Sequence, residues 1–257
     1  MEEGLALVGG AGVDVLEGGG GADILSDTSG STFFNGGAGA DTMTGSSAAD
    51  LFAGGAGNDS LITGGGADLI LFNRGDGKDT VGATNVSDDT LSLGGVTYTD
   101  LLLKRSGNNL ILLTGNSEQI TFTDWYAGSG NRSVSQLQVV IEGTTDYLAS
   151  SGDPLRNHAV QSFNFLGIVA AFDAALAATP GLSSWAVTNA LTGFHLSGSD
   201  TAAVGGDLAY RYGRDHSFAD ISFNPALGVM GTTGFGSTAQ GLLPLSSLQD
   251  ASPRLGA

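Results

Sequence analysis

The sequence contains no cysteine, five prolines and only nine lysines and arginines among 257 residues. The absence of cysteine excludes disulfide frameworks, thiolate zinc sites, iron–sulfur clusters and thiol nucleophiles. The shortage of cationic side chains opposes nucleic-acid binding, because that affinity rests on lysine and arginine meeting phosphates. It equally opposes a polybasic surface that binds membranes. The chain is instead rich in glycine, with 43 residues, and in acid, with 26, so its net charge is −17.

The acids and the glycines are concentrated in the same part of the chain. Residues 1–90 hold 14 acids against Arg74 and Lys78 alone, which amounts to −12 of the net −17, and they hold 22 of the 43 glycines. A disordered acidic tail would be rich in charge and poor in large aliphatic residues. This chain is 41% apolar and 14% charged. Glycine and aspartate therefore need a common structural explanation.

A nine-residue repeat supplies that explanation. Its first unit reads GGAGVDVLE and its sixth reads GGAGNDSLI. The units begin at Gly9, Gly18, Asp27, Gly36, Gly45, Gly54 and Thr63. Their sixth residues are Asp14, Asp23, Thr32, Asp41, Asp50, Asp59 and Asp68, and after a two-residue slip RGDGKDTV adds Asp79. Their eighth residues are Leu16, Leu25, Phe34, Met43, Phe52, Leu61 and Ile70, all apolar.

This repeat resembles the nonapeptide GGxGxDxUx of RTX proteins, the secreted bacterial proteins with haemolysin-type calcium-binding repeats. The resemblance implies a mainly β fold with a right-handed parallel β-roll, a calcium-binding solenoid in which units n and n+2 stack in register. The first six residues of a unit form a turn, where glycine permits positive φ. The last three form a strand whose eighth-position side chain points inward. We expect the roll over 1–90, a β-rich extension or cap over 91–145, and a helical, then mixed α/β, C-terminal domain over 146–257.

The stacked turns predict bound calcium. Strands stack about 4.8 Å apart, and at an effective dielectric near 20 two carboxylates at that distance repel by roughly 3–4 kcal/mol. Calcium accepts six to eight oxygens in flexible geometry, whereas magnesium demands a stricter octahedron, and transition metals favour the His and Cys that the repeat lacks. The alternative, aspartates that cap Asx-turns without metal, does not explain the stacking of like charges.

The expected calcium ligands are carboxylates and turn carbonyls, for several ions. The carboxylates are those of Asp14, Asp23, Asp41, Asp50, Asp59, Asp68 and Asp79, with Asp88 or Asp89 closing the final site. A solvated loop is the equal alternative for that last pair. The residues of the turns are Gly9, Ala11, Gly18, Gly20, Gly21, Gly36, Ala38, Gly39, Gly54, Ala56, Gly57, Gly64, Gly66 and Gly77.

The two edges of the roll differ in sequence. We call the edge that carries Asp23, Asp41, Asp59 and Asp79 the even edge, and the edge that carries Asp14, Thr32, Asp50 and Asp68 the odd edge. The even edge has glycine in every turn and predicts a continuous row of calcium. The odd edge predicts a gap near Thr32, with a site between Asp50 and Asp68 favoured over any above it.

Beyond the repeat, the pattern predicts strands at 88–93, 100–105, 109–114, 118–126 and 136–143, with a hairpin turn at 106–109. The string ITFTDWY at 120–126 is similar to the domain that often follows RTX blocks. We expect this region to extend and cap the roll, since a solenoid otherwise ends in an open sheet edge.

The C-terminal third changes character. Helical spacing predicts helices at 160–179, which Pro180 and Gly181 end, and at 183–194. Neither contains 18 uninterrupted apolar residues, so neither predicts a membrane span. The last sixty residues resemble the uncleaved signal of type I secretion substrates, which implies the type I secretion machinery as partner. The N-terminus lacks the pattern of a cleavable signal peptide. We expect a secreted or surface protein of a Gram-negative bacterium, here represented by the C-terminal region of a longer chain.

The sequence predicts no enzyme. It contains neither HExxH nor GxSxG, and its three histidines lack ligand spacing. Tyr210, Arg211, Arg214, Asp215 and His216 form a polar cluster that we interpret as internal charge pairing, with a secretion contact as the alternative. A pocket joining His216, Asp215 and Tyr210 would reopen the enzyme hypothesis. The bond between Asp153 and Pro154, which some RTX relatives cleave, lacks a nearby acidic loop here and predicts an uncut domain junction.

Two functions remain. The first is a calcium-binding structural and secretion module that folds outside the cell as calcium arrives. The second is an adhesin end or surface-layer subunit that self-assembles in calcium and uses the C-terminal third as its contact surface.

Overall fold

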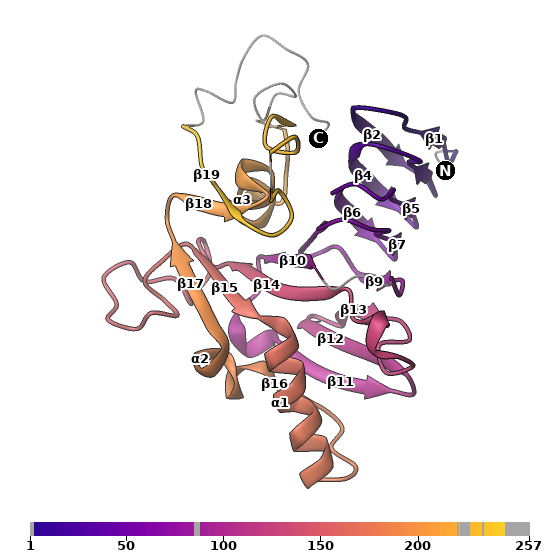
Figure 1. Cartoon of the computed structure of the whole chain (residues 1–257). Helices are drawn as coiled ribbons and strands as arrows, with labels where there is room; N and C mark the ends of the chain where they lie inside the picture. The colour runs from indigo at the N-terminus through magenta and orange to yellow at the C-terminus, as the bar shows by residue number, and fades with distance from the viewer. Residues whose placement is uncertain (1–2, 85–87, 220, 222–226, 233, 245–257) are drawn as a thin grey trace.

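The structure, a computed structural model, describes residues 3–84, 88–219, 221, 227–232 and 234–244. Two sheets enclose the apolar positions of the repeat (Figure 1). Sheet A has the order β1 (Ala6–Val8), β3 (Ile24–Ser26), β5 (Thr42–Thr44), β7 (Ser60–Ile62), β9 (Lys78–Val81), β13 (Glu118–Phe122), β12 (Asn109–Gly115), β11 (Leu102–Ser106) and β16 (Trp185–Ala186). Sheet B has the order β17 (His195–Ser199), β15 (Val160–Asn164), β14 (Val134–Val140), β10 (Asp89–Gly94), β8 (Leu69–Asn73), β6 (Leu51–Gly57), β4 (Ser31–Gly39) and β2 (Val13–Gly20).

The predicted stacking of units n and n+2 is confirmed. Strands of the repeat pair in parallel with a register of 18 residues, as in Leu25 opposite Met43 and Phe34 opposite Phe52. The two sheets differ in strand length, however. The repeat strands β1, β3, β5 and β7 of sheet A have three residues, whereas β2, β4 and β6 of sheet B have seven to nine and continue into the glycine turns. The longer strands form because stacked glycine backbones pair directly, as at Gly37 and Gly55.

The core of the roll is the column of eighth-position side chains. All seven are buried, from Leu16 at 8% exposed to Phe34 and Phe52 at 0%. The rings of Phe34 and Phe52 stack with centroids 4.8 Å apart. This column runs without a break into the buried residues of 91–191. The roll and the region after it therefore share one hydrophobic core.

Residues 89–140 extend both sheets. Strand β10 pairs in parallel with β8, and β14 pairs in parallel with β10. In sheet A, β13 pairs in parallel with β9, and the antiparallel hairpin of β11 and β12 follows. All five predicted strands of this region are present, and the hairpin turn at 106–109 is confirmed.

The helix prediction at 160–179 is correct only in part. Val160–Asn164 form β15, because their backbone pairs in antiparallel fashion with β14, and α1 spans Phe165–Ala178. The Asn164 side chain caps α1 by accepting a hydrogen bond from the Gly167 N–H at 2.9 Å.

The single helix predicted at 183–194 is wrong. The segment contains β16, the short 3-10 helix η3 (Val187–Asn189) and the four-residue α2 (Leu191–Phe194). Trp185 and Ala186 pair instead with the edge strand β11, and this tertiary pairing overrides the local pattern.

The C-terminal segment, by which we mean the described residues from Ala202 onward, covers the outer face of sheet B. Helix α3 (Gly206–Asp215) lies against β8, β10 and β14, and β18 (Ala202–Val204) and β19 (Ala239–Gly241) form a hairpin-like pair beside it (Figure 1). A second apolar cluster joins Phe33, Leu51 and Leu69 of the roll to Leu208 and Tyr212 of α3.

Among the described residues no helix is both long and apolar enough to cross a membrane. Part of the predicted secretion signal, 245–257, lies outside the described residues.

The inward column should dominate the stability of the roll. We expect Phe52→Ala to lower the free energy of unfolding in saturating calcium by about 3–5 kcal/mol, because it opens a cavity and removes the stack on Phe34. Ile24→Ala is the matched control, since Ile24 lies on the same roll but is 57% exposed. Denaturant titration measures both, and similar losses for the two variants would contradict this account.

Candidate metal centre

The even edge is a ladder of buried carboxylates. Oδ1 of each aspartate accepts a hydrogen bond from a backbone N–H one layer earlier. Leu5 donates to Asp23 at 2.6 Å, Asp23 to Asp41 and Asp41 to Asp59 at 2.8 Å, and Asp59 to Asp79 at 3.0 Å. These four carboxylates belong to residues that are only 1–4% exposed. The register of 18 residues thus places the like charges directly above one another inside the protein.

The second oxygens of three of these carboxylates have no hydrogen-bond partner. Oδ2 of Asp23, Asp41 and Asp59 is buried and unpaired. A Cβ built on Gly18 would lie 2.3 Å from Oδ2 of Asp23 and 2.5 Å from the carbonyl oxygen of Gly36. A carboxylate oxygen and a turn carbonyl of the next layer therefore approach one glycine. Such hard oxygen donors fit calcium.

The odd edge repeats the Oδ1 contacts, but Oδ2 of Asp50 accepts from the Ser46 N–H at 2.9 Å. Thr32 donates its N–H to Oδ1 of Asp50 at 2.6 Å, Asp50 to Asp68 at 2.8 Å, and Asp68 to Asp89 at 3.1 Å. Oδ2 of Asp68 is buried and unpaired. At the top of the edge, Asp14 accepts instead from Gly10 of its own turn at 2.7 Å.

The structure distinguishes between the two aspartates at the end of the repeat. Asp89 is fully buried and continues the odd ladder, whereas Asp88 is exposed. The sequence analysis missed Thr63, whose hydroxyl donates to Oδ2 of Asp89 at 3.0 Å. The carbonyl of Thr63 lies 2.3 Å from the Cβ position of Gly45, beside Oδ2 of Asp50. The signal available in the sequence was that Thr63 is the first residue of its repeat unit, where most units have glycine.

The predicted turn residues lie on the two edges, but some of their carbonyl oxygens already accept backbone hydrogen bonds. The carbonyl of Ala38 accepts from the Gly21 N–H at 2.9 Å, and that of Gly77 accepts from Gln119 at 3.0 Å. The glycines are required where layers approach closely. A Cβ on Gly39, whose φ is +141°, would lie 1.6 Å from the carbonyl oxygen of Gly21. Among the described residues, no three acidic or histidine side chains gather at one point, so each site depends on backbone oxygens as well.

Burial makes the ladder costly to ionise. It raises the pKa of Asp50 to about 6, of Asp59 to about 7 and of Asp79 to about 8. Neighbouring carboxylates add to the shift, with Asp41 acting on Asp59 and Asp59 on Asp79. Burial and the charge of Asp89 likewise raise the pKa of Asp68. Without a cation, Asp50, Asp59, Asp68 and Asp79 therefore bind a proton more readily in the folded roll than in the unfolded chain.

A polar contact joins the C-terminal segment to the roll. Asp76 is fully buried and accepts from the Asn73 N–H at 2.6 Å and the Tyr212 hydroxyl at 3.0 Å. Nε2 of His216 lies 2.6 Å from its Oδ1, and this hydrogen bond raises the pKa of His216. Sequence analysis did not single out Asp76, because it is the third residue of the unit that begins at Arg74, a position where the repeat has no aspartate.

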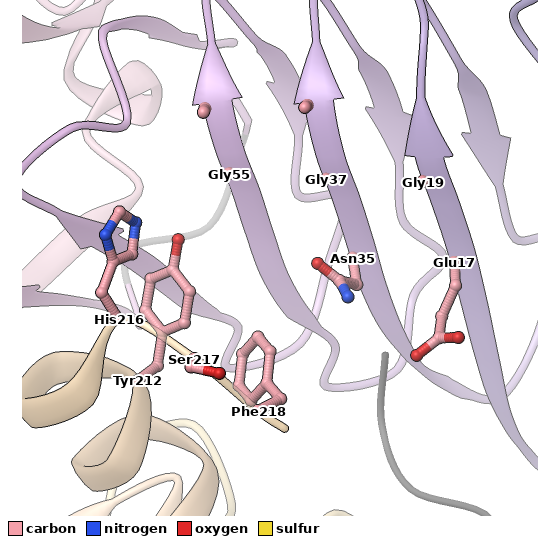
Figure 2. A pocket seen from close by; sticks show the side chains of 11 residues that line it. Glu17, Gly19, Asn35, Gly37, Gly55, Tyr212, His216, Ser217 and Phe218 are labelled. Carbon is pink, nitrogen blue, oxygen red and sulfur yellow. The ribbon is translucent and has the colours of Figure 1, made fainter. Parts of the chain in front are cut away.

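A cavity of about 320 Å³ lies beside this contact. Figure 2 shows Tyr212, His216, Ser217 and Phe218 on one side of the cavity and the strands that carry Glu17, Asn35 and three stacked glycines on the other. The cavity does not join the three residues of the enzyme hypothesis. Tyr210 bonds to Glu142, and Asp215 pairs with Arg214.

The remaining polar cluster pairs internally. Arg211 lies 3.8 Å from Asp207, and the guanidinium groups of Arg211 and Arg214 lie over the Tyr210 ring.

In the exposed turn of Asp153 and Pro154, Oδ1 of Asp153 accepts from the Leu155 N–H at 3.0 Å.

The fold and the edges define a class of protein, the parallel β-roll whose turns present stacked carboxylates and carbonyls to hard cations. Comparison with family models identifies the repeat: four copies of the RTX calcium-binding nonapeptide repeat match residues 6–26, 26–61 and 44–81. Residues 6–81 are therefore RTX calcium-binding repeats, and these repeats bind several calcium ions. The match spans 6–81, about 30% of the chain. None of the curated proteins compared with the chain matches it.

The raised pKa values predict an inverted pH dependence without calcium. The folded pKa values of Asp50, Asp59 and Asp79 lie above the unfolded value of about 3.9, so the stability of the calcium-free roll is greatest below pH 4 and falls as pH rises through 6–8. Circular dichroism in calcium-free buffer should therefore show more β-structure at pH 5 than at pH 8. In calcium the dependence should reverse, because protons compete with the metal.

A variant separates this effect from general charge repulsion. Asp59→Asn should reduce the difference between pH 5 and pH 8, and Asp153→Asn, in an exposed turn outside the roll, should leave it unchanged. Calcium-free β-structure that increases with pH would contradict the argument.

Proposed function

We propose that this chain is a calcium-binding structural and secretion module that folds on Ca²⁺ binding outside the cell, at the C-terminus of a large RTX protein exported by type I secretion. The observation that carries the proposal is the ladder of buried aspartates with unpaired Oδ2 atoms. RTX repeats are characteristic of secreted bacterial proteins. The repeat block is a structural fold, and we assign it no catalytic role.

The ladder links folding to the calcium concentration. Desolvation and like-charge stacking both oppose the ionised roll at neutral pH. Calcium supplies the missing charge and binds the unpaired oxygens, and because no site exists in the unfolded chain, binding free energy becomes folding free energy. In the calcium-poor cytosol the chain stays unfolded, and outside the cell it folds. Folding on the outer side favours outward passage.

The proposed ligands follow the two edges. On the even edge they are the carboxylates of Asp23, Asp41, Asp59 and Asp79 with carbonyls of the glycine turns. On the odd edge they are the carboxylates of Asp14, Asp50, Asp68 and Asp89. Asp88 is exposed and is not needed to continue the ladder.

The C-terminal segment supports a role for the chain before folding as well. The apolar face of α3, with Leu208 and Tyr212, is buried in a cluster to which β4, β6 and β8 contribute Phe33, Leu51 and Leu69. While the roll is unfolded this face has no such partner. The segment is then free to engage the type I secretion machinery, and formation of the roll withdraws α3 from it.

Calcium should convert the chain from coil to β-structure. We expect circular dichroism of the chain in chelator at pH 7.5 to show mostly coil, and addition of millimolar calcium to produce the β-roll. Asp59→Asn keeps an oxygen for the Asp41 N–H but removes the charge, so it should raise the calcium needed for folding about tenfold or more, the equivalent of about 1.5–3 kcal/mol. Asp153→Asn should leave the midpoint unchanged. A chain fully folded in chelator would overturn the proposal.

An adhesin or surface-layer assembly module is the second candidate, with the C-terminal third as its contact surface. Leu196 on β17 and Leu243 are 57% and 42% exposed there. Strand β17 is an edge of sheet B, and an edge strand with an exposed apolar side chain pairs readily with another strand. Light scattering in millimolar calcium distinguishes the candidates: assembly should produce oligomers that Leu196→Lys reduces, whereas a monomer under all conditions would exclude it.

A further inference from the structure

In four of the repeat units, the first and sixth residues share one space. A Cβ built on Gly18 would lie 2.3 Å from Oδ2 of Asp23 in the same unit. The corresponding distances are 2.5 Å for Gly36 and Asp41, 2.6 Å for Gly45 and Asp50, and 2.4 Å for Gly54 and Asp59. In these units a glycine at the first position leaves room for the carboxylate of the sixth.

The unit 27–35 inverts this arrangement. Its sixth residue is Thr32, which carries no carboxylate, and its first residue is Asp27. The side chain of Asp27 therefore starts from the position next to which the sixth-position carboxylate lies in the other units. The Thr32 hydroxyl donates to Oδ2 of Asp27 at 2.9 Å, and both residues are buried, at 0% and 5% exposed.

Asp27 lies between two other carboxylates of the odd edge. A Cβ on Gly9 would lie 3.0 Å from Oδ1 of Asp27 and 3.3 Å from Oδ2 of Asp14, so the two side chains converge on one glycine. In the other direction, the charge of Asp27 acts unfavourably on Asp50. None of the ion pairs found among the described residues involves Asp27.

We propose that Asp27 is a calcium ligand that supplies the carboxylate missing at Thr32, so that the odd-edge row continues from Asp14 to Asp50 without a gap. This replaces the interruption that the sequence pattern predicts at Thr32. The inference deepens the proposed function, because it rests on calcium binding by the roll. The row on the odd edge then reads Asp14, Asp27, Asp50, Asp68 and Asp89.

Turn capping alone does not account for Asp27. Its Oδ1 accepts from the N–H groups of Thr28 at 2.7 Å and Ser29 at 3.2 Å. A neutral side-chain oxygen makes the same caps, as asparagine and serine commonly do. A buried charge next to two like charges is unfavourable unless a cation compensates it.

The test counts bound calcium and compares neutral and relocated carboxylates. Asp27→Asn keeps the capping oxygen and removes the charge, Asp27→Gly removes both, and the double variant Asp27→Gly with Thr32→Asp restores the arrangement of the other units. Native mass spectrometry and calorimetric titration of the full chain, folded in calcium, give the number of ions and their affinities. Asp153→Asn is the control for removing an aspartate that caps a turn outside the roll.

We expect Asp27→Asn and Asp27→Gly to lose at least one ion or to bind it at least tenfold more weakly, and the double variant to regain the wild-type number. An Asp27→Asn chain with the wild-type number and affinity would overturn the proposal. So would a double variant that stays as deficient as Asp27→Gly, because the loss would then come from capping. Either result leaves the proposed function intact as long as the wild-type chain binds calcium and folds with it. A wild-type chain that binds none would refute both.

Discussion

The stacking of buried carboxylates at a spacing of one strand is the constraint on which this structure depends. One oxygen of most of these carboxylates is satisfied by a backbone N–H of the neighbouring layer, as Asp41 shows by accepting from Asp23. In Asp23, Asp41, Asp59 and Asp68 the other oxygen is buried with no partner in the protein. The core that opposes this cost is narrow, because each layer adds one inward side chain per strand, such as Phe34 or Phe52. Hydrophobic burial and the cations must therefore act together, and calcium becomes part of the fold rather than an addition to it.

The same constraint reaches the C-terminal segment. Helix α3 packs on side chains that three successive layers present in register, and this surface exists only when the layers are stacked. The buried contact of Asp76 with Tyr212 and His216 adds a polar link to the turn that precedes Asp79. A module whose last part packs on the first part folds as one unit, and the second apolar cluster joins these two parts.

The repeat was enough to predict the register, the inward column and the two aspartate edges, since each follows from a strict period of nine. It did not predict what covers sheet B, although a weaker signal with a period of 18 was present. The seventh residues Phe33, Leu51 and Leu69 face the C-terminal segment, whereas Ile24, Thr42 and Ser60 at the same position of sheet A are exposed. Where no repeat exists, local pattern failed for another reason. VQSFN at 160–164 fits both a helix and a strand, and only the free edge of β14 decides between them.

The degenerate unit shows why a repeat should be examined in pairs of positions rather than in single columns. Considered alone, Thr32 marks a lost aspartate and Asp27 a lost glycine, and the two losses together suggest a weakened turn. In the folded chain the first and sixth positions of a unit lie next to each other. Glycine is needed at the first position to make room for a carboxylate at the sixth. Once the sixth residue is threonine, the first residue can itself be an aspartate. What the edge must conserve is the charge next to the neighbouring layers, not the position that carries it. Sequence periodicity records positions, and only the structure shows that two of them present a carboxylate to the same place.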